Sequence, residues 1–91
     1  MIEDLDFDPW EARWIELAPI YQIEFWSTPG GPGSMWHADV TRLKEASSVE
    51  DVLTWARAQA EGRQFTIYAE VNRGTDRGRV RLFGTDPTRP D

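Results

Sequence analysis

Residues 48–72, SVEDVLTWARAQAEGRQFTIYAEVN, combine a complete predicted helix with a complete predicted strand. Ser48 suits the N-cap position, Asp51 follows three residues later, and acidic side chains in the first turn favour the positive end of a helix dipole. The pattern predicts a helix that extends to about Glu61 and stops at Gly62. Its apolar face comprises Val49, Val52, Leu53, Ala56 and Ala60, with Trp55 at the border.

Directly after this helix, apolar and polar residues alternate from Gln64 to Asn72. Such alternation indicates a strand with one buried face and one polar face. The predicted buried side chains are Phe65, Ile67, Ala69 and Val71, and the opposite face carries Gln64, Thr66, Tyr68, Glu70 and Asn72. We therefore expect the helix to pack on the Phe65–Val71 side.

Two further strands are predicted before the helix, at residues 20–26 and 35–43, separated by the Gly- and Pro-rich loop 27–34. In the first strand Tyr21, Ile23 and Phe25 share one face, and Gln22, Glu24 and Trp26 the other. In the second strand the alternation places Trp36, Ala38 and Val40 on the buried face and Met35, His37, Asp39 and Thr41 opposite.

A fourth strand is predicted from Arg79 to Gly84, after a polar loop at residues 72–78. Val80 and Leu82 are expected to point inward, and Arg79, Arg81 and Phe83 outward. The last two strands then form a hairpin, as do the first two.

The chain begins with a short predicted helix, from Pro9 to Leu17, capped by Asp8. Trp10, Trp14 and Leu17 lie on one side of it. This apolar stripe is expected to dock on the rest of the domain or on a partner protein.

Together these elements predict an α+β fold, in which a short N-terminal helix precedes a ββαββ unit whose four-stranded antiparallel sheet has one helix packed on one face. With 91 residues, the chain is long enough for a single small domain, 1–91. We expect residues 1–7 and 85–91 to be loosely ordered.

Composition restricts the function further. The net charge of −6 argues against general affinity for nucleic acid or anionic membranes, and an acidic protein favours a basic partner. The sequence has no Cys, so it offers no disulfide, thiolate nucleophile or Cys-ligated metal, and no cofactor motif is present. No segment reads as a secretory signal or a membrane span, and a cytoplasmic protein is expected.

The sheet face opposite the helix is the expected site of function. It is predicted to present Trp26, Tyr68 and Phe83 interleaved with Arg79 and Arg81, and aromatic residues and Arg are the types enriched in interface cores. With Trp10 and Trp14 of the first helix, these residues predict a non-enzymatic protein-binding or self-associating module, such as a homodimer. The competing interpretation is an ordinary solvated sheet face with cross-strand polar pairs.

Two other functions are compatible with the same face. His37 and Asp39 share one face of a strand and Glu24 is expected nearby, which suits a small ligand-binding or metal-binding protein or an acid–base enzyme. Alternatively, Tyr68 and Phe83 can stack on the bases of a single-stranded nucleic acid while Arg79 and Arg81 neutralise its backbone. The acidic net charge disfavours the second of these.

Overall fold

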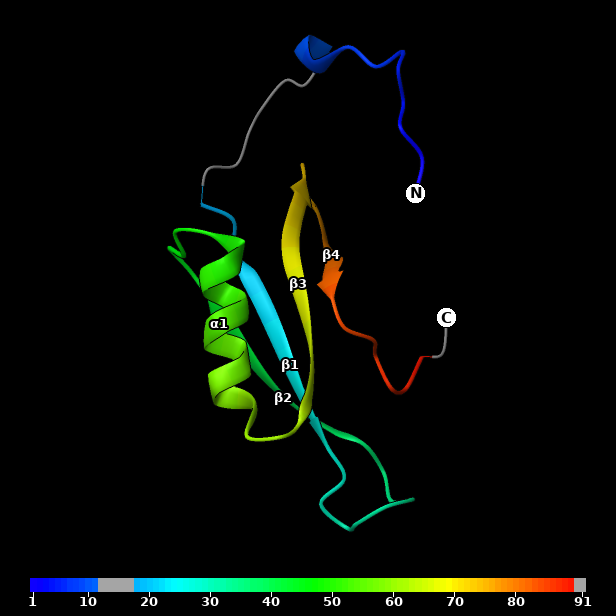
Figure 1. The fold of residues 1–91 in the computed structure, drawn as a ribbon, viewed down its shortest axis with the longest axis vertical. Helices are drawn as coiled ribbons and strands as arrows, with labels where there is room; N and C mark the ends of the chain where they lie inside the picture. The colour runs from blue at the N-terminus through cyan, green and yellow to red at the C-terminus, as the bar shows by residue number, and fades with distance from the viewer. Residues whose placement is uncertain (12–17, 90–91) are drawn as a thin grey trace.

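A computed structural model describes residues 1–11 and 18–89, which contain one four-stranded antiparallel sheet and one α-helix (Figure 1). The elements are a 3-10 turn η1 (Pro9–Glu11), strands β1 (Tyr21–Ser27) and β2 (His37–Leu43), helix α1 (Val49–Ala60), and strands β3 (Gln64–Arg73) and β4 (Asp76–Phe83). This confirms the α+β class and the ββαββ order. Within the described residues, no helix is long and apolar enough to cross a membrane.

Helix α1 has the ends that its sequence predicts. The Ser48 hydroxyl accepts a hydrogen bond from the Asp51 backbone N–H at 3.1 Å, as an N-cap does. At the other end Glu61 and Gly62 both have positive φ, 52° and 83°, so the chain leaves the helix in a left-handed turn. Gly62 removes the steric cost from one of these two positions.

The strand order β2-β1-β3-β4 places β1 and β3 in the centre of the sheet, and α1 packs on these two strands. We call the side under α1 the helix face and the opposite side the reverse face. The core lies on the helix face and consists of Tyr21, Ile23, Phe25, Val52, Ala56, Ala60 and Ile67. The edge strands β2 and β4 are largely exposed.

The predicted orientation of the second strand is wrong. Ile23 is paired with Thr41 and Tyr21 with Leu43, so the odd-numbered residues of β2 share the helix face. Leu43 packs against the core, whereas Val40 lies on the reverse face and is 57% exposed. Strand β2 is an edge strand that lies beyond the helix, so its apolar alternation says little about which of its side chains face the core. Leu43, the one β2 residue that packs against the core, determines the orientation of the strand.

The predicted orientation of Phe83 is wrong as well. Strands β3 and β4 pair from Arg73 and Asp76 onward, so the hairpin is tighter than the predicted loop. Tyr68 pairs with Arg81 but Ile67 pairs with Phe83, which leaves Leu82 as an extra residue in a β-bulge. The bulge turns Phe83 to the helix face, where its ring stacks on Phe65 at 5.2 Å between centroids.

After β4 the chain reverses at Gly84 and residues 85–89 lie against the reverse face, on the side of the sheet away from α1 (Figure 1). The Thr66 hydroxyl donates to the Thr85 carbonyl at 3.3 Å. Asp86 is only 9% exposed, and its carboxylate accepts hydrogen bonds from the backbone N–H and the hydroxyl of Thr88. This segment therefore covers part of a sheet face that would otherwise be open.

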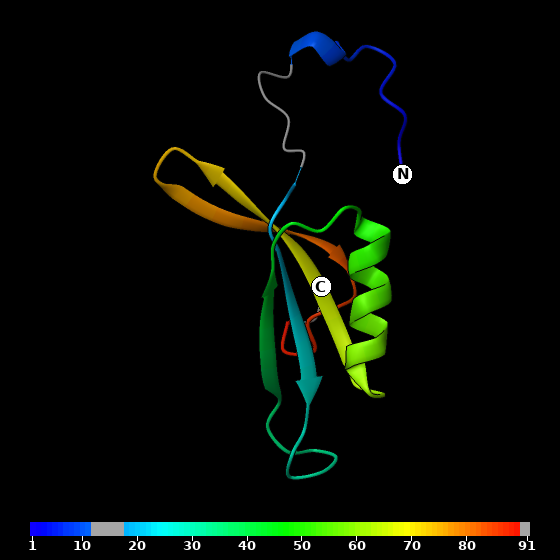
Figure 2. The same cartoon turned by 90° about the vertical axis from the view of Figure 1, so that its left-hand side faces the viewer.

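Residues 1–11 lie beyond one end of the sheet (Figures 1 and 2). The described part of the predicted first helix is the 3-10 turn Pro9–Glu11, where the Asp8 carboxylate accepts from the Trp10 N–H as the cap prediction requires. Trp10 is 89% exposed and does not dock on the domain. Trp14 and Leu17 lie outside the described residues.

Gly84 is expected to be the least replaceable glycine. Its φ is +82°, and a Cβ there would overlap the carbonyl oxygen of Phe65. Gly84→Ala should lower the free energy of unfolding by about 3 kcal/mol or more in a urea titration. Gly33→Ala is the matched control, because φ is +84° but a Cβ meets no atom within 4 Å. Equal losses of unfolding free energy from the two changes would contradict the close approach of Gly84 to the Phe65 carbonyl.

Candidate functional site

The aromatic half of the predicted binding face is internal. Trp26 is 7% exposed, and its indole N–H donates to the Thr66 hydroxyl at 3.0 Å. The Thr66 hydroxyl in turn donates to the Thr85 carbonyl, so the three residues form one hydrogen-bonded chain from β1 through β3 to the C-terminal segment. Trp26 is thus part of a small second core, not a surface for contact.

Tyr68 is also covered, at 8% exposure. The Arg79 guanidinium lies over its ring, 3.9 Å from the centroid, in a cation–π contact. Arg81, Asp86 and Arg89 line one hollow together with Tyr68. Burial raises the pKa of the Tyr68 hydroxyl, and the negative charge of Glu24 adds to the effect.

The predicted binding residues are therefore only partly brought together. Trp26, Tyr68, Arg79 and Arg81 do share the reverse face, as predicted. Phe83 is on the helix face, Trp10 projects from residues 1–11, and Trp14 falls outside the described residues. The exposed groups of the reverse face include Arg42, Arg77 and Arg79, and these three arginines line a groove.

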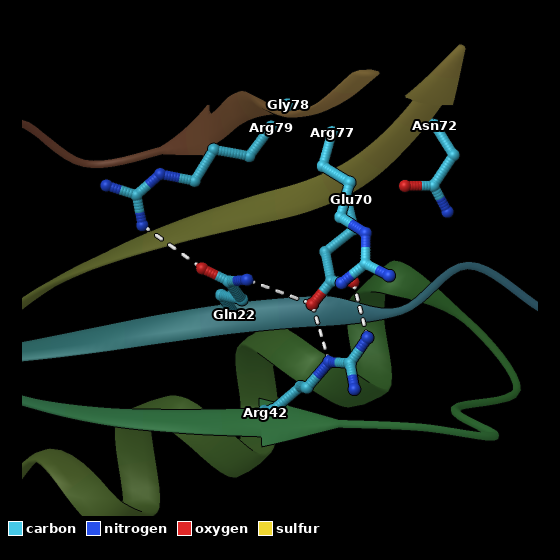
Figure 3. Close-up of a pocket in the computed structure, with 7 residues that line it drawn as sticks. All are labelled: Gln22, Arg42, Glu70, Asn72, Arg77, Gly78 and Arg79. Atoms are coloured by element: carbon cyan, nitrogen blue, oxygen red, sulfur yellow. Dashed lines mark hydrogen bonds and ion pairs between the residues drawn. The ribbon is translucent and has the colours of Figure 1, made fainter. Parts of the chain in front are cut away.

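The floor of this groove is a row of polar side chains that crosses the sheet (Figure 3). Arg42 on β2 forms a two-point pair with Glu70 on β3, in which Nε donates to Oε2 and Nη2 to Oε1, both at 2.6 Å. Gln22 on β1 lies between them and donates to Glu70 Oε2 at 2.9 Å. Such a charge-assisted pair fixes both the position and the plane of the Arg42 guanidinium.

Strand β4 supplies the other wall. Arg79 donates to the Gln22 side-chain oxygen at 3.2 Å and lies 3.4 Å from a carboxylate oxygen of Glu24. Arg77 makes no side-chain hydrogen bond or ion pair within residues 1–11 and 18–89, although its charge acts on Glu70. We call this site the arginine groove; its volume is about 430 Å³ and its lining residues are Gln22, Arg42, Glu70, Asn72, Arg77, Gly78 and Arg79.

The arginine groove has more positive than negative charge. Three of its lining residues are arginines and one is a glutamate. The hydrogen bonds from Arg42 and Gln22 hold the pKa of the Glu70 carboxyl down, from 4.5 to about 2. Glu70 therefore neutralises one guanidinium at neutral pH, and the groove keeps an excess of positive charge that suits a carboxylate or another anion.

The alternative site around His37 is not assembled. His37 Nε2 lies 3.2 Å from Asp39 Oδ1, and Arg63 pairs with the other Asp39 oxygen at 3.0 Å. Glu24 is on the reverse face, because it pairs with Val40, whereas Asp39 pairs with Phe25 on the helix face. The described residues contain no group of three His, Cys, Asp or Glu side chains arranged to hold a metal ion.

The stacking platform expected for a nucleic acid is not assembled either. Tyr68 is buried under Arg79, and Phe83 lies on the opposite side of the sheet. The two rings therefore cannot stack on successive bases of one strand.

The sequence patterns do not predict two residues of the groove. Arg42 lies on the reverse face because the true orientation of β2 is opposite to the predicted one, and Arg77 belongs to β4 and not to the predicted loop. A signal for Arg77 is present in the sequence, since arginines at 77, 79 and 81 follow the two-residue period of a strand face.

Comparison with known proteins adds no functional information. No family model matches the sequence, and no curated protein or solved structure resembles it.

Loss of the Thr66 hydroxyl tests whether Trp26 is internal. Thr66→Val leaves the buried indole N–H without an acceptor, and unfolding should become easier by about 1–3 kcal/mol. Exchange of the Trp26 indole proton, followed by NMR, should accelerate. Thr54→Val, at an exposed position of α1, is the control. A stability equal to that of the control would show that Trp26 is solvated.

The Arg42–Glu70 pair predicts a pH dependence of stability. Because the folded state lowers the Glu70 pKa, this carboxylate stabilises the fold above a pH of about 4.5, and the contribution disappears as the pH falls toward 2. Glu70→Gln should be less stable than the native chain at pH 7, and the difference should shrink between pH 5 and about 2 in urea titrations. A difference that is independent of pH would contradict the pairing.

Proposed function

We propose that this protein is a small protein-binding module that uses the arginine groove to bind an acidic segment. The supporting observation is the unequal charge of the groove, where Arg42 is paired with Glu70 and Arg79 with Glu24, and Arg77 is left without an ion pair in the described chain. This proposal keeps the predicted binding face but changes its chemistry, because Arg77 and Arg79 are exposed whereas Trp26 and Tyr68 are buried.

The position of the groove favours an extended segment over a compact ligand. It runs across the sheet to β4, an edge strand whose eight residues are all exposed. An edge strand can pair with an added strand through backbone hydrogen bonds, while neighbouring side chains select the sequence. A segment lying along β4 would bring its carboxylates to Arg77 and Arg79.

The same chain contains an acidic segment whose charge is opposite to that of the arginine groove. Residues 1–11 contain five acidic residues and no Lys or Arg. The composition predicts either self-association or a basic partner, and self-association satisfies both the acidic segment and the basic groove. The cytoplasmic location expected from the composition remains part of this proposal.

Arg77 provides the cleanest test of the groove. A fluorescein-labelled peptide of alternating Glu and Phe should bind the full chain, as measured by fluorescence anisotropy. Arg77→Ala should weaken that binding about tenfold, since a hydrogen bond to a charged group contributes about 1.5–3 kcal/mol. Folding should be unaffected, because Arg77 has no hydrogen-bond partner in the described chain.

Arg57→Ala is the matched control, as Arg57 lies on α1 next to Phe83, on the other side of the sheet. A peptide in which Lys replaces Glu should not bind. Equal affinity of the Arg77→Ala and Arg57→Ala proteins for the Glu and Phe peptide would overturn the proposed function.

A further inference from the structure

Residues 1–11, which we call the acidic arm, expose apolar side chains between their carboxylates. Ile2 is 93% exposed, Leu5 86%, Phe7 66% and Trp10 89%. The acids Glu3, Asp4, Asp6, Asp8 and Glu11 alternate with them. Large apolar side chains left in water at this density are typical of a segment that orders on a partner.

A small hollow adjoins the arginine groove at the edge of the sheet. It is lined by Val71, Asp76, Arg77, Gly78, Arg79 and Val80, and its volume is about 230 Å³. Arg77, Gly78 and Arg79 line both this hollow, which we call the Gly78 notch, and the groove. Val80 is 52% exposed and pairs with Ala69, and Gly78 pairs with Val71, so the notch offers apolar surface on the helix-face side of β4, across this edge strand from the guanidiniums.

Gly78 keeps the notch open. It pairs with Val71 across the β3–β4 hairpin, and a Cβ added at Gly78 would meet no atom within 4 Å. A side chain at this position would therefore fill the notch without disturbing the protein's own packing. Its φ is also outside the left-handed region, so other residues can adopt it.

We propose that the acidic arm of a second copy of this chain occupies the arginine groove and the Gly78 notch, so that two copies exchange arms. Trp10 inserts into the notch on the helix-face side of β4, and the neighbouring carboxylates of Asp8 and Glu11 reach around this edge strand to pair with Arg77 and Arg79. This inference rests on the proposed function and names the partner of the same groove.

Charge complementarity identifies a second copy as the occupant. Two chains of net charge −6 repel each other unless the contact joins an acidic part of one to a basic part of the other. The acidic arm and the arginine groove are such parts, with five acids in the first and three arginines in the second. The arm stands clear of the groove of its own chain, with Trp10 in solvent.

Exchange in both directions gives enough contact for a specific dimer. A large aromatic side chain buries about 150–250 Å². Phe7 and Trp10 from two arms therefore bury about 600–1,000 Å² before Ile2, Leu5 and the receiving surfaces are counted. A stable interface requires about 1,000 Å² or more in total. With Ile2, Leu5 and the receiving surfaces added, a two-fold symmetric exchange of both arms reaches this range.

The test uses full-length chains with one partner of the contact altered at a time. The arm variant carries Trp10→Ala and Asp8→Asn, and the groove variant carries Gly78→Val and Arg77→Ala. Sedimentation velocity over a concentration series should show a dimer for the native chain, with the dissociation constant weakened about a hundredfold in each variant. Circular dichroism should show that both variants stay folded.

Mixing the two variants gives the sharpest result. The heterodimer restores one of the two contacts, because the intact arm of the groove variant meets the intact groove of the arm variant. If the contacts are independent, a hundredfold weakening in each homodimer becomes about tenfold in the mixture. Glu50→Gln and Arg57→Ala on α1 are the charge controls and should leave the native dimer unchanged.

Several results would overturn the inference. A native chain that stays monomeric, variants that dimerise like the native chain, or a mixture no tighter than either variant alone would each exclude arm exchange. If the native chain is a monomer and Arg77 still governs binding of the Glu and Phe peptide, the proposed function stands and only the exchange is wrong. If peptide binding is also absent, both are wrong.

Discussion

The packing of α1 on β1 and β3 is the constraint on which the rest of the structure depends. Val52, Ala56 and Ala60 close over Ile23 and Ile67, and this contact determines which residues of β1 and β3 face the helix. One helix covers two strands, so β2 and β4 extend beyond it. Because the helix covers only two of the four strands, both edge strands are exposed. The reverse face is also covered only in part by the described chain.

The reverse face is divided into two halves with different chemistry. Next to Gly84, Trp26 and Tyr68 are buried, and a chain of hydrogen bonds from the Trp26 indole through Thr66 to the C-terminal segment replaces the water that this indole would otherwise need. Toward the β3–β4 turn no segment of the described chain covers the sheet, and the exposed side chains are guanidiniums ordered by Glu70 and Gln22. The first half stabilises the fold, and the second half is the binding site that we propose.

The sequence predicts the central elements well and the edges poorly, for a physical reason. Helix α1 and strand β3 are buried along one face, so their apolar period reports that burial directly. Strand β2 is exposed along most of its length, and its residue Val40 and the preceding Trp36 are exposed against expectation. The bulge at Leu82 turns the Phe83 side chain to the helix face. The position of this bulge depends on the end of the hairpin, and no local sequence pattern predicts it.

The candidate site was half predictable. The alternation of strand residues predicts the positions of Arg79 and Arg81. The position of Arg42 depends on the orientation of β2, and the burial of Tyr68 depends on the path of the chain after β4.

Nitrogen-15 NMR of the arginine side chains during titration with the Glu and Phe peptide tests most directly the central claim, that the arginine groove binds an acidic segment. Binding in the groove predicts shifts confined to Arg42, Arg77 and Arg79, with Arg57 and Arg63 unchanged. Shifts centred on Arg57 and Arg63, or none at all, would contradict it.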